Sequence, residues 1–480
     1  MLLPVTFLVP VIGGPVISRC VPELRRSRTL YAALLIVTDL LLIASLFSGS
    51  PLTVVTFAER ATLTFAWDGL GRLFAVVTSV LYTAVCFYAF EYMQKEERPA
   101  VFFAFYFVSY GALLAVSMSA NLVTMYFCFE LLTLSTVPLV LHELTKDAVS
   151  AGLKYLFYSI GGALFGLLAV FFVYSYSTGD ASFVSGGFVD PAKVALHPNL
   201  FLAMMLLGII GFGTKAGMYP MHGWLPAAHP IAPAPASSLL SGIVAKAGVI
   251  CIIRLVFYCV GADILRGTWV QTVWMCLTML TVFMGSMMAF REKIMKKRLA
   301  YSTISQISYI LMGLSLLSEE GLRGGLLHLM QHAASKGCLF LVAGVFIYKY
   351  GIRNVADLKA IGKRMPVTMW CFTIASLSLI GIPPLGGFVS KWVIASASLR
   401  SGMGFLSVAG PVVLLISALL TAGYLLPVTV DAFFPNQQEE AAEAENDEPS
   451  PLMTVPMIVL CCVTLFVGLF GTSLLGALGF

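Results

Sequence analysis

Long apolar stretches recur from one end of the sequence to the other, and they constrain the fold more than any other feature. A helix that crosses a membrane needs about 20 mostly apolar residues, and about fourteen stretches meet that requirement. Charged residues make up 11% of the 480 residues, too few to cover the surface of a water-soluble protein of this length. We therefore predict an all-α integral membrane protein with about fourteen transmembrane helices.

The predicted spans are distributed along the whole chain. They begin near Leu2, Thr29, Leu70, Val101, Leu122, Leu153, Leu200, Ser238, Val270, Leu299, Gly325, Val367, Phe405 and Met453. The first stretch, Met1 to Ser18, has no basic leading region, so we expect a spanning helix there and not a cleaved signal.

Lys and Arg are concentrated in the loops after the first, ninth and eleventh predicted spans, at residues 19–28, 291–298 and 349–364. All three loops lie on the same side, because each follows an odd-numbered span. Basic loops face the cytoplasm, so both termini are expected outside. The outside segment 47–69 is rich in Thr and Val and is expected to form a hairpin. The acidic stretch 437–450 is expected to be a solvated linker on the cytoplasmic side.

The cysteines and the net charge exclude several kinds of site. The ten Cys include no Cys-x-x-Cys pair, which argues against an iron–sulfur cluster, a zinc site or a disulfide framework. The net charge of +5 comes with basic residues placed in short loops between apolar runs, so we expect no nucleic-acid partner.

Several ionisable residues lie inside the predicted spans, where a charge costs at least about 2.5–3.5 kcal/mol on insertion scales. Glu130, Lys215, Lys246 and Lys391 lie in the fifth, seventh, eighth and twelfth spans. A structural explanation is that the Glu130 carboxylate pairs with a lysine and only joins helices to each other. The functional explanation is an ion path, and we favour it. Arg254 is expected to extend outward from the end of its span.

His328, His332 and Lys336 lie in the eleventh span at a spacing of four residues, so they share one helix face. Paired His at this spacing can bind a metal ion, but no third ligand accompanies them. Because His titrates near neutral pH, a proton relay suits this face better. Hydroxyl and amide groups of the tenth span are expected to hold water beside it: Ser302, Thr303, Ser305, Gln306 and Ser308. Asp39 and Glu91 are weaker signals, interpreted as structural or partner-facing.

Two predicted spans contain glycines and prolines that should break the helix. Pro220 follows Lys215 closely, and Pro383 with Pro384 precedes Lys391. Broken helices in the middle of a membrane often form ion sites of transporters. The two broken spans are five helices apart, an odd number, so equivalent helices run in opposite directions. This spacing predicts two inverted five-helix repeats, each with a broken helix.

With these residues in place, the chain resembles the antiporter-like membrane subunits shared by respiratory complex I, multisubunit Na+/H+ antiporters and membrane-bound energy-converting hydrogenases. The resemblance covers roughly residues 65–430. It rests on Lys215 with Gly223-Trp-Leu-Pro, on Ala232-Pro-Ala-Pro-Ala-Ser-Ser-Leu-Leu-Ser-Gly-Ile-Val-Ala-Lys, on Leu299-Ala-Tyr-Ser-Thr-Ile-Ser-Gln, on His332 with Lys336, and on Gly381-Ile-Pro-Pro-Leu-Gly-Gly-Phe-Val-Ser-Lys. Trp224-Leu-Pro-Ala-Ala-His-Pro is more similar to the antiporter D subunits and hydrogenase members than to complex I.

The resemblance implies an order for the buried groups. Glu130 and Lys215 form the charge pair of one half, and Lys246 passes protons toward the centre. His328 and His332, with Lys336 on the same face, then connect to Lys391 as the exit lysine.

The resemblance also implies a domain division and a cellular location. Residues 1–100 hold the first three helices and the hairpin, 101–260 and 261–434 the two half-channels, 435–451 the acidic loop, and 452–480 a last helix. The location implied is a prokaryotic plasma membrane.

The function implied is that of a proton-translocating, or Na+/H+ antiporting, subunit of a multisubunit complex, either hydrogenase-type or a multisubunit antiporter. The alternatives are a complex I subunit, a largely structural membrane subunit, or a stand-alone solute carrier. We expect no catalysis and no cofactor in this chain alone. Implied partners are other antiporter-like and small membrane subunits, lipids, and peripheral redox subunits with iron–sulfur and either nickel–iron or flavin groups.

Overall fold

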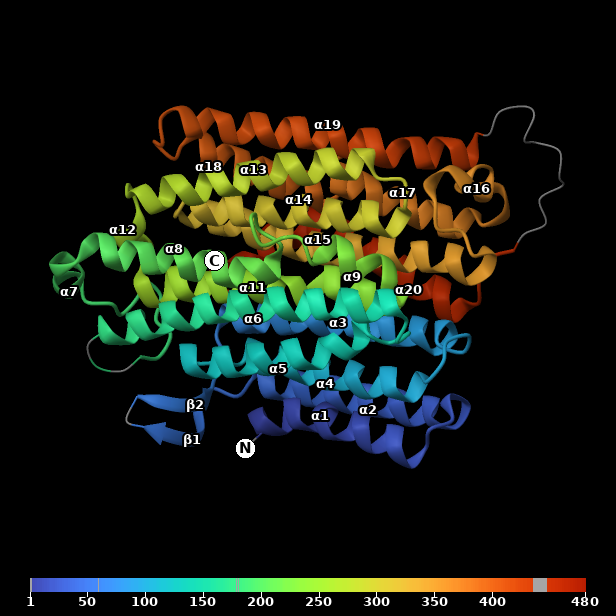
Figure 1. Cartoon of the computed structure of the whole chain (residues 1–480), viewed down its shortest axis with the longest axis horizontal. Coiled ribbons are helices and arrows are strands. Elements are labelled where there is room, and N and C mark those ends of the chain that lie inside the picture. The colour runs from blue at the N-terminus through green and yellow to red at the C-terminus, as the bar shows by residue number, and fades with distance from the viewer. Residues whose placement is uncertain (1, 59, 178, 180, 435–446) are drawn as a thin grey trace.

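The computed structural model describes residues 2–58, 60–177, 179, 181–434 and 447–480, and nearly all of its regular structure is helical (Figure 1). The helices up to residue 265 are α1 (Leu2–Cys20), α2 (Leu24–Leu46), α3 (Gly69–Tyr92), α4 (Pro99–Ser117), α5 (Leu122–Val140), α6 (Lys146–Ser175), α7 (Pro191–Leu196), α8 (Pro198–Ala216), α9 (Leu225–Ile231), α10 (Ala234–Leu239), η1 (Leu240–Val244), α11 (Ala245–Ile253), η2 (Arg254–Val260) and α12 (Ala262–Leu265). The helices that follow are α13 (Trp269–Arg291), α14 (Met295–Ser315), α15 (Glu319–Tyr350), η3 (Val355–Leu358), α16 (Ile361–Arg364), α17 (Pro366–Ile380), α18 (Gly386–Leu399), α19 (Phe405–Phe433) and α20 (Pro451–Ala477).

Twelve helices in the described part of the chain are long and apolar enough to cross a membrane. They correspond to twelve of the predicted spans. The tenth predicted span is α14, which begins with three basic residues and is rich in hydroxyl groups. The twelfth is divided into the short apolar helix α17 and helix α18. An apolar helix satisfies all its backbone groups internally, which is why these stretches become helices.

Polar side chains begin several of the helices. The side chains of Asp68, Asn121 and Thr145 accept hydrogen bonds from backbone N–H groups in the first turns of α3, α5 and α6, at 2.9, 2.8 and 3.1 Å. Ser318 does the same for α15 at 3.1 Å. These caps satisfy donors that have no partner inside the helix, so they set where each helix starts.

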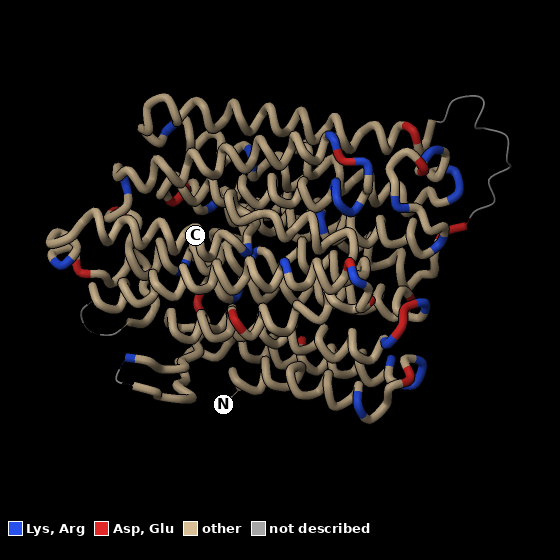
Figure 2. Tube along the Cα trace, in the orientation of Figure 1, with Lys and Arg blue, Asp and Glu red and all other residues tan. Residues whose placement is uncertain are grey.

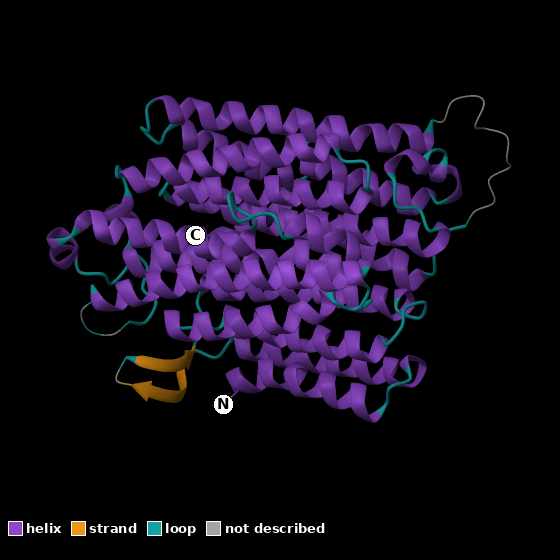
Figure 3. Cartoon of the chain, viewed as in Figure 1, coloured by secondary structure: helices purple, strands orange, loops and turns teal. Residues whose placement is uncertain are grey.

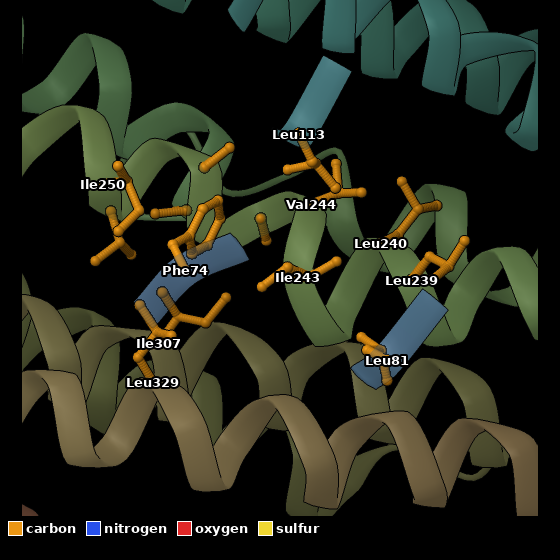
Figure 4. Packing of buried hydrophobic residues seen from close by; sticks show 14 of the residues in the cluster. Phe74, Leu81, Leu113, Leu239, Leu240, Ile243, Val244, Ile250, Ile307 and Leu329 are labelled. Atoms are coloured by element: carbon orange, nitrogen blue, oxygen red, sulfur yellow. The ribbon is translucent and has the colours of Figure 1, made fainter. Parts of the chain in front are cut away.

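The centre of the molecule is built by α15 and by the continuous segment from α10 to η2. In one apolar window of 18 residues from each of these two spans, 94% and 89% of the residues are buried, against 22% in such a window of α1 and 28% in one of α19. Figure 4 shows side chains of the α10–α11 region packed together with side chains of α3, α4, α14 and α15. A helix that is apolar on all sides and buried on all sides belongs in the core of a bundle. The polar groups carried by α11 and α15 are therefore enclosed by protein.

Strands β1 (Leu52–Ala58) and β2 (Ala61–Phe65) pair antiparallel in the segment where Thr and Val predicted a hairpin. Figure 3 shows this hairpin beside the helices at the lower left of the view. Asn121, which caps α5, and Thr124 of α5 hold it in place through hydrogen bonds with Thr62 and Thr64. The hairpin is thereby joined to the first turn of α5.

Lys and Arg gather at one end of the bundle, toward the right of Figure 2, where the basic loops lie. Residues 435–446, most of the predicted acidic linker, lie outside the described residues. Asp447 and Glu448, in the last part of this stretch, contact the helices. Asp447 accepts hydrogen bonds from Lys349 and Tyr350, each at 2.6 Å, and the Lys349 bond lowers the pKa of its carboxyl. Glu448 accepts from the backbone and side chain of Thr368, at the start of α17.

Candidate functional site

Both predicted helix breaks are present as interruptions between two helices. Helix α8 ends at Ala216, and Gly217 follows with a φ of +76°. Helix α17 ends at Ile380, and Gly381 follows with a φ of +99°. Glycine tolerates this left-handed conformation, which stops the helix and leaves its last carbonyl groups without helical partners. Pro220 lies in the turn that follows α8. Pro383 and Pro384 lie in the turn that follows α17.

Lys391 lies directly at the second break. It belongs to α18, and its Nζ donates to the carbonyl oxygens of Leu379 and Ile380 at 2.6 and 2.9 Å. These are the last two carbonyls of α17, at the negative end of that helix, where a cation is favoured. The side chain is 6% exposed. The break therefore supplies the polar environment that holds this buried lysine.

The second break also depends on close backbone packing. A Cβ at Gly387 would lie 1.6 Å from the Ser378 carbonyl oxygen, so α18 begins against the backbone of α17. We expect Gly387→Ala to destabilise the protein by about 3 kcal/mol or more, since the backbone cannot yield as a side chain does. A lowered melting temperature of the purified complex would show this effect. Gly476→Ala is the control, because nothing lies within 4 Å of its added Cβ. Equal melting temperatures for the two variants would contradict the prediction.

Lys215 lies in the last turn of α8 and is 1% exposed. Its Nζ donates to Thr133 Oγ1 at 3.0 Å and to the Tyr155 hydroxyl at 2.5 Å. It also lies 4.6 Å from the centre of the Tyr155 ring, within the range of a cation–π contact. Helices α5, α6 and α8 thus converge on one ammonium group.

Glu130 lies one helical turn before Thr133 on α5. Its Oε1 atom is buried and has no hydrogen-bond partner among the described residues. The described residues show no ion pair between Glu130 and Lys215, although the resemblance implies one. Thr133 and Tyr155 take the direct contacts of the ammonium instead. The direct partners of this ammonium are therefore hydroxyl groups and not the carboxylate.

Lys246 and Lys336 occupy the centre of the bundle, on α11 and α15, and both are fully buried. The Nζ of Lys246 donates to the Ser241 carbonyl, and that of Lys336 donates to the Leu299 carbonyl at 3.1 Å. In the described part of the chain, neither forms an ion pair with a carboxylate. The π-helical turn η1, which contains Ser241, precedes α11, and such turns are frequent at functional sites.

The two histidines of α15 lie on one face of the helix, with ring centres 6.0 Å apart. His328 Nδ1 is 2.9 Å from Ser390 Oγ of α18, whereas both ring nitrogens of His332 are buried without a hydrogen-bond partner among the described residues. Tyr309 connects this pair to the second break. Its ring lies edge-on to His328 at 5.3 Å, and Lys391 Nζ lies 5.1 Å from its centre.

Sequence reasoning missed two buried groups between the basic loops and the centre. His229 is fully buried, stacks on Phe340 at 4.7 Å, and has no hydrogen-bond partner for either ring nitrogen in the described structure. Lys296 was counted among the loop charges, but it is 4% exposed and its Nζ donates to the Ala232 carbonyl. The polar His229 inside a proline-rich apolar segment was the available signal. The burial of Lys296 had none, since Lys297 and Arg298 directly follow it and the three look like one basic loop.

Arg254 also departs from its prediction. It does not extend outward to the membrane surface: it is 2% exposed and forms two hydrogen bonds to the Asp68 carboxylate, one of 2.8 Å. The guanidinium lies 4.6 and 4.8 Å from the ring centres of Phe183 and Tyr258. The prediction failed because the partner lies 186 residues away in the sequence.

Asp39 and Glu91 have structural contacts. Asp39 of α2 accepts hydrogen bonds from Ser79 and Thr83 of α3, both at 2.8 Å, and from Tyr110 of α4. Glu91 accepts from the Tyr348 hydroxyl at 3.0 Å. Asp39 therefore joins three helices, which agrees with the structural interpretation of this residue.

Comparison with known proteins places this arrangement among membrane subunits. The family description "NADH:quinone oxidoreductase/Mrp antiporter, TM" matches residues 119–417. NADH-quinone oxidoreductase subunit N of Desulforudis audaxviator is 30% identical over 421 residues, which cover 85% of this chain and 82% of that protein. Hydrogenase-4 component B of Escherichia coli is 32% identical over 435 residues, or 86% of this chain and 63% of the relative.

A further relative is Na(+)/H(+) antiporter subunit A1 of Staphylococcus haemolyticus, 29% identical over 425 residues. The match covers 84% of this chain but 52% of that subunit, so this chain spans about half of it. It likewise spans less than two thirds of the hydrogenase component.

Two solved structures have the same fold. A chain of the archaeal membrane-bound sulfane sulfur reductase superposes with a TM-score of 0.82 at 25% identity, covering 98% of this chain and 76% of that one. A chain of the Mrp complex from a Dietzia species superposes with a TM-score of 0.83 at 22% identity, covering 100% and 96%. The broken helices and buried lysines therefore lie on a fold of membrane complexes, and the chain belongs to the NADH:quinone oxidoreductase/Mrp antiporter transmembrane family.

Proposed function

We propose that this chain translocates protons, alone or in exchange for Na+, as one membrane subunit of a multisubunit complex. The observation that carries the proposal is a set of fully or almost fully buried basic side chains that extends from one helix break to the other. These side chains are Lys215, Lys246, Lys336, His332, His328 and Lys391. Ionisable groups at membrane depth are costly, so a series of them is explained best by a function that needs protons there.

The contacts of these buried lysines and histidines suit proton transfer better than they suit permanently charged side chains. Lys246 and Lys336 donate to backbone carbonyls, and the described residues place no carboxylate in an ion pair with either. A buried ammonium without an anion is expensive, so a small change nearby suffices to make it release its proton. At an effective dielectric constant of about 20, one charge 4 Å away contributes about 4 kcal/mol. Movement of Glu130 relative to Lys215 therefore suits the control of proton occupancy.

The proposed order is Glu130 and Lys215, then Lys246, then Lys336 with the two histidines of α15, and finally Lys391. Lys296 and His229 extend this order toward the basic loops. Lys296 donates to the carbonyls of Pro230 and Ala232, and His229 directly precedes Pro230 in the chain. We propose that they take up protons from that side and pass them toward Lys336.

The domain division is part of the proposal. Residues 101–260 and 261–434 form two half-channels of inverted orientation, each with one break, and α14 and the α17–α18 pair bring the number of spans to fourteen. Residues 1–100 and 452–480 flank them. The basic loops and the loop 435–451 face the cytoplasm of a prokaryote, and both termini lie outside.

The driving force has to come from partner subunits. The relatives include a quinone oxidoreductase subunit, a hydrogenase component and an antiporter subunit. We propose a hydrogenase-type complex or a multisubunit antiporter, with a quinone oxidoreductase as the second candidate. In the redox cases, iron–sulfur and nickel–iron or flavin groups belong to the partner subunits.

The test is purification of the assembled complex through a tag on this chain, followed by reconstitution into vesicles that contain a pH-sensitive dye. We expect a pH change across the membrane when the electron donor or a Na+ gradient is supplied, and the subunit composition then identifies the driving complex. Unchanged coupling in Lys391→Ala would instead indicate a structural subunit. Solute uptake by the isolated chain, without partners, would overturn the proposal in favour of a solute carrier.

A further inference from the structure

A second group of buried polar side chains lies outside the lysine and histidine series. It consists of hydroxyl groups from α13, α14 and α19, each at most 1% exposed: Ser286, Ser302, Ser305, Tyr309, Ser417, Thr421 and Tyr424. Helices in a membrane can be joined by single hydroxyl groups, so their presence alone has a structural explanation. Their connections to one another need a further explanation.

Four of these hydroxyls form one hydrogen-bonded cluster in the interior. The Tyr309 hydroxyl donates to Ser417 Oγ at 2.5 Å, and Ser417 Oγ is 3.1 Å from Ser305 Oγ. Ser286 Oγ is hydrogen-bonded to both serines, at 2.7 Å to Ser305. Every member of this cluster is therefore linked to another member through its own hydroxyl group.

Three more hydroxyls lie one helical turn nearer to the basic loops. The Tyr424 hydroxyl donates to Ser302 Oγ at 2.6 Å and lies 3.3 Å from Thr421 Oγ1. Arg298, in the first turn of α14, donates to the Tyr424 carbonyl at 2.9 Å. This outer cluster therefore begins at the end of the bundle where the basic loops lie.

The ring of Tyr309, a member of the inner cluster, lies beside the second helix break. Lys391 Nζ lies 5.1 Å from the centre of the Tyr309 ring, and His328 lies edge-on to the same ring. Together the two clusters extend from Arg298 to the surroundings of Lys391. Their course follows α14 and α19 and does not include Lys215, Lys246 or Lys336.

The pattern differs from that of ordinary hydroxyls in the same helices. Thr278, Thr281 and Ser315 donate to carbonyls three or four residues earlier in their own helix, at 2.8, 2.6 and 2.8 Å. This is the usual behaviour of Ser and Thr in a helix. Bonds between two side chains are only about 10–15% of protein hydrogen bonds, whereas the inner cluster contains four. Association of α13, α14 and α19 would not require so many hydrogen bonds between side chains.

We propose that these hydroxyls form a second proton path, from the basic-loop end of α14 and α19 to Lys391. The proposal rests on the proposed function and adds an uptake route that supplies Lys391 with a proton. The charge states of Lys215, Lys246 and Lys336 drive the release of that proton, so translocation requires both routes. Each hydroxyl accepts a proton on an oxygen lone pair and donates its own proton to the next oxygen. The row of hydroxyl groups therefore holds the same number of protons after the transfer as before it. The neutral Lys391 amine receives the last proton and becomes an ammonium. In this proposal, bridging waters span the helical turn between the two clusters and the gap between the Tyr309 hydroxyl and Lys391 Nζ.

The experiment uses the assembled complex in vesicles, with proton translocation followed by a pH-sensitive dye. Tyr424→Phe and Ser417→Ala each remove one oxygen from the path. We expect each to lower the translocation rate about tenfold, equivalent to about 1.4 kcal/mol of barrier. Subunit content and melting temperature should stay within the range of the controls. If Ser417→Ala fails to assemble, Tyr424→Phe alone decides the result.

The controls are Tyr88→Phe and Ser398→Ala, which remove buried hydroxyls that donate to the carbonyls of Leu341 and Ser407. Unchanged rates in both path variants would overturn the proposal, as would equal losses in the controls. Lys215→Ala separates this result from the proposed function. If that variant also translocates at the full rate, the proposed function itself fails. If Tyr424→Phe and Ser417→Ala translocate at the full rate but Lys215→Ala does not, the second path alone is wrong.

Discussion

Replacing Lys215 with Ala abolishes proton translocation by the assembled complex, with a loss of about a hundredfold or more. Lys215 is the group on which Thr133, Tyr155 and the end of α8 converge, and the variant removes its titratable amine. The two hydroxyls left behind can form a hydrogen bond with each other or with water, so the helices should still assemble. The measurement is the initial rate of the pH change in vesicles, normalised to the amount of complex.

Lys215→Arg separates charge from proton release. A guanidinium keeps the positive charge but does not give up its proton, so this variant should be as inactive as Lys215→Ala. Glu130→Ala should also abolish translocation, since the proposed mechanism assigns this carboxylate to the control of Lys215. Lys297→Ala is the control, because that side chain is 36% exposed and pairs with Glu292. Full translocation in both Lys215→Ala and Glu130→Ala would refute the mechanism.

The second large effect is expected at the pair of Asp68 and Arg254, and it should be unequal between the two partners. Asp68→Asn keeps an oxygen that can cap α3 through Gly71, but it leaves the guanidinium buried and without a counterion. That change should cost about 3 kcal/mol of stability. Arg254→Met removes the buried charge, and the remaining Asp68 side chain is 36% exposed and can be hydrated. Its cost should be about 1 kcal/mol.

The same pair predicts a dependence on pH. Burial by itself would raise the pKa of Asp68, but the Arg254 guanidinium and the hydrogen bond from Gly71 lower it below the usual range. At a pH above the pKa that Asp68 has in the unfolded chain, its carboxylate therefore stabilises the folded state. This contribution is lost as the pH falls through the pKa that Asp68 has in the folded protein. The loss should occur below about pH 4.

Melting curves of the purified complex provide the measurement for both statements. Wild type should have the highest melting temperature, Arg254→Met a lower one and Asp68→Asn the lowest. The extra loss of stability below pH 4 should be absent from Asp68→Asn. A lower melting temperature for Arg254→Met than for Asp68→Asn would show that the aromatic contacts with Phe183 and Tyr258, and not the uncompensated charge, dominate.

The sequence predicted the class of fold from local properties. Spans follow from apolar length, because a membrane helix satisfies its hydrogen bonds within itself and needs no distant partner. The breaks at Gly217 and Gly381 follow from backbone conformation, which is equally local. The same holds for Lys215, Lys246 and Lys391, since a lysine near the middle of an apolar stretch is recognisable without knowing its neighbours.

Contacts between distant helices were not predictable in this way. Arg254 was expected to extend outward and is instead buried against Asp68, and Lys296 was counted with a loop and is instead buried beside Ala232. Hydroxyl groups of α14 were expected to hold water, whereas Ser302 and Ser305 bond to residues of α19. In each case the partner is far away in the sequence.

The sequence by itself therefore determined that this protein is a helical membrane protein with buried lysines near two helix breaks, because those properties depend on residue type and spacing along one helix. Only the tertiary structure decided which oxygen each lysine contacts, that Thr133 and Tyr155 take the direct contacts of Lys215, and that hydroxyls of α13, α14 and α19 form one cluster. These features depend on how helices pack side by side, and interhelical packing is set by the shapes of many side chains together.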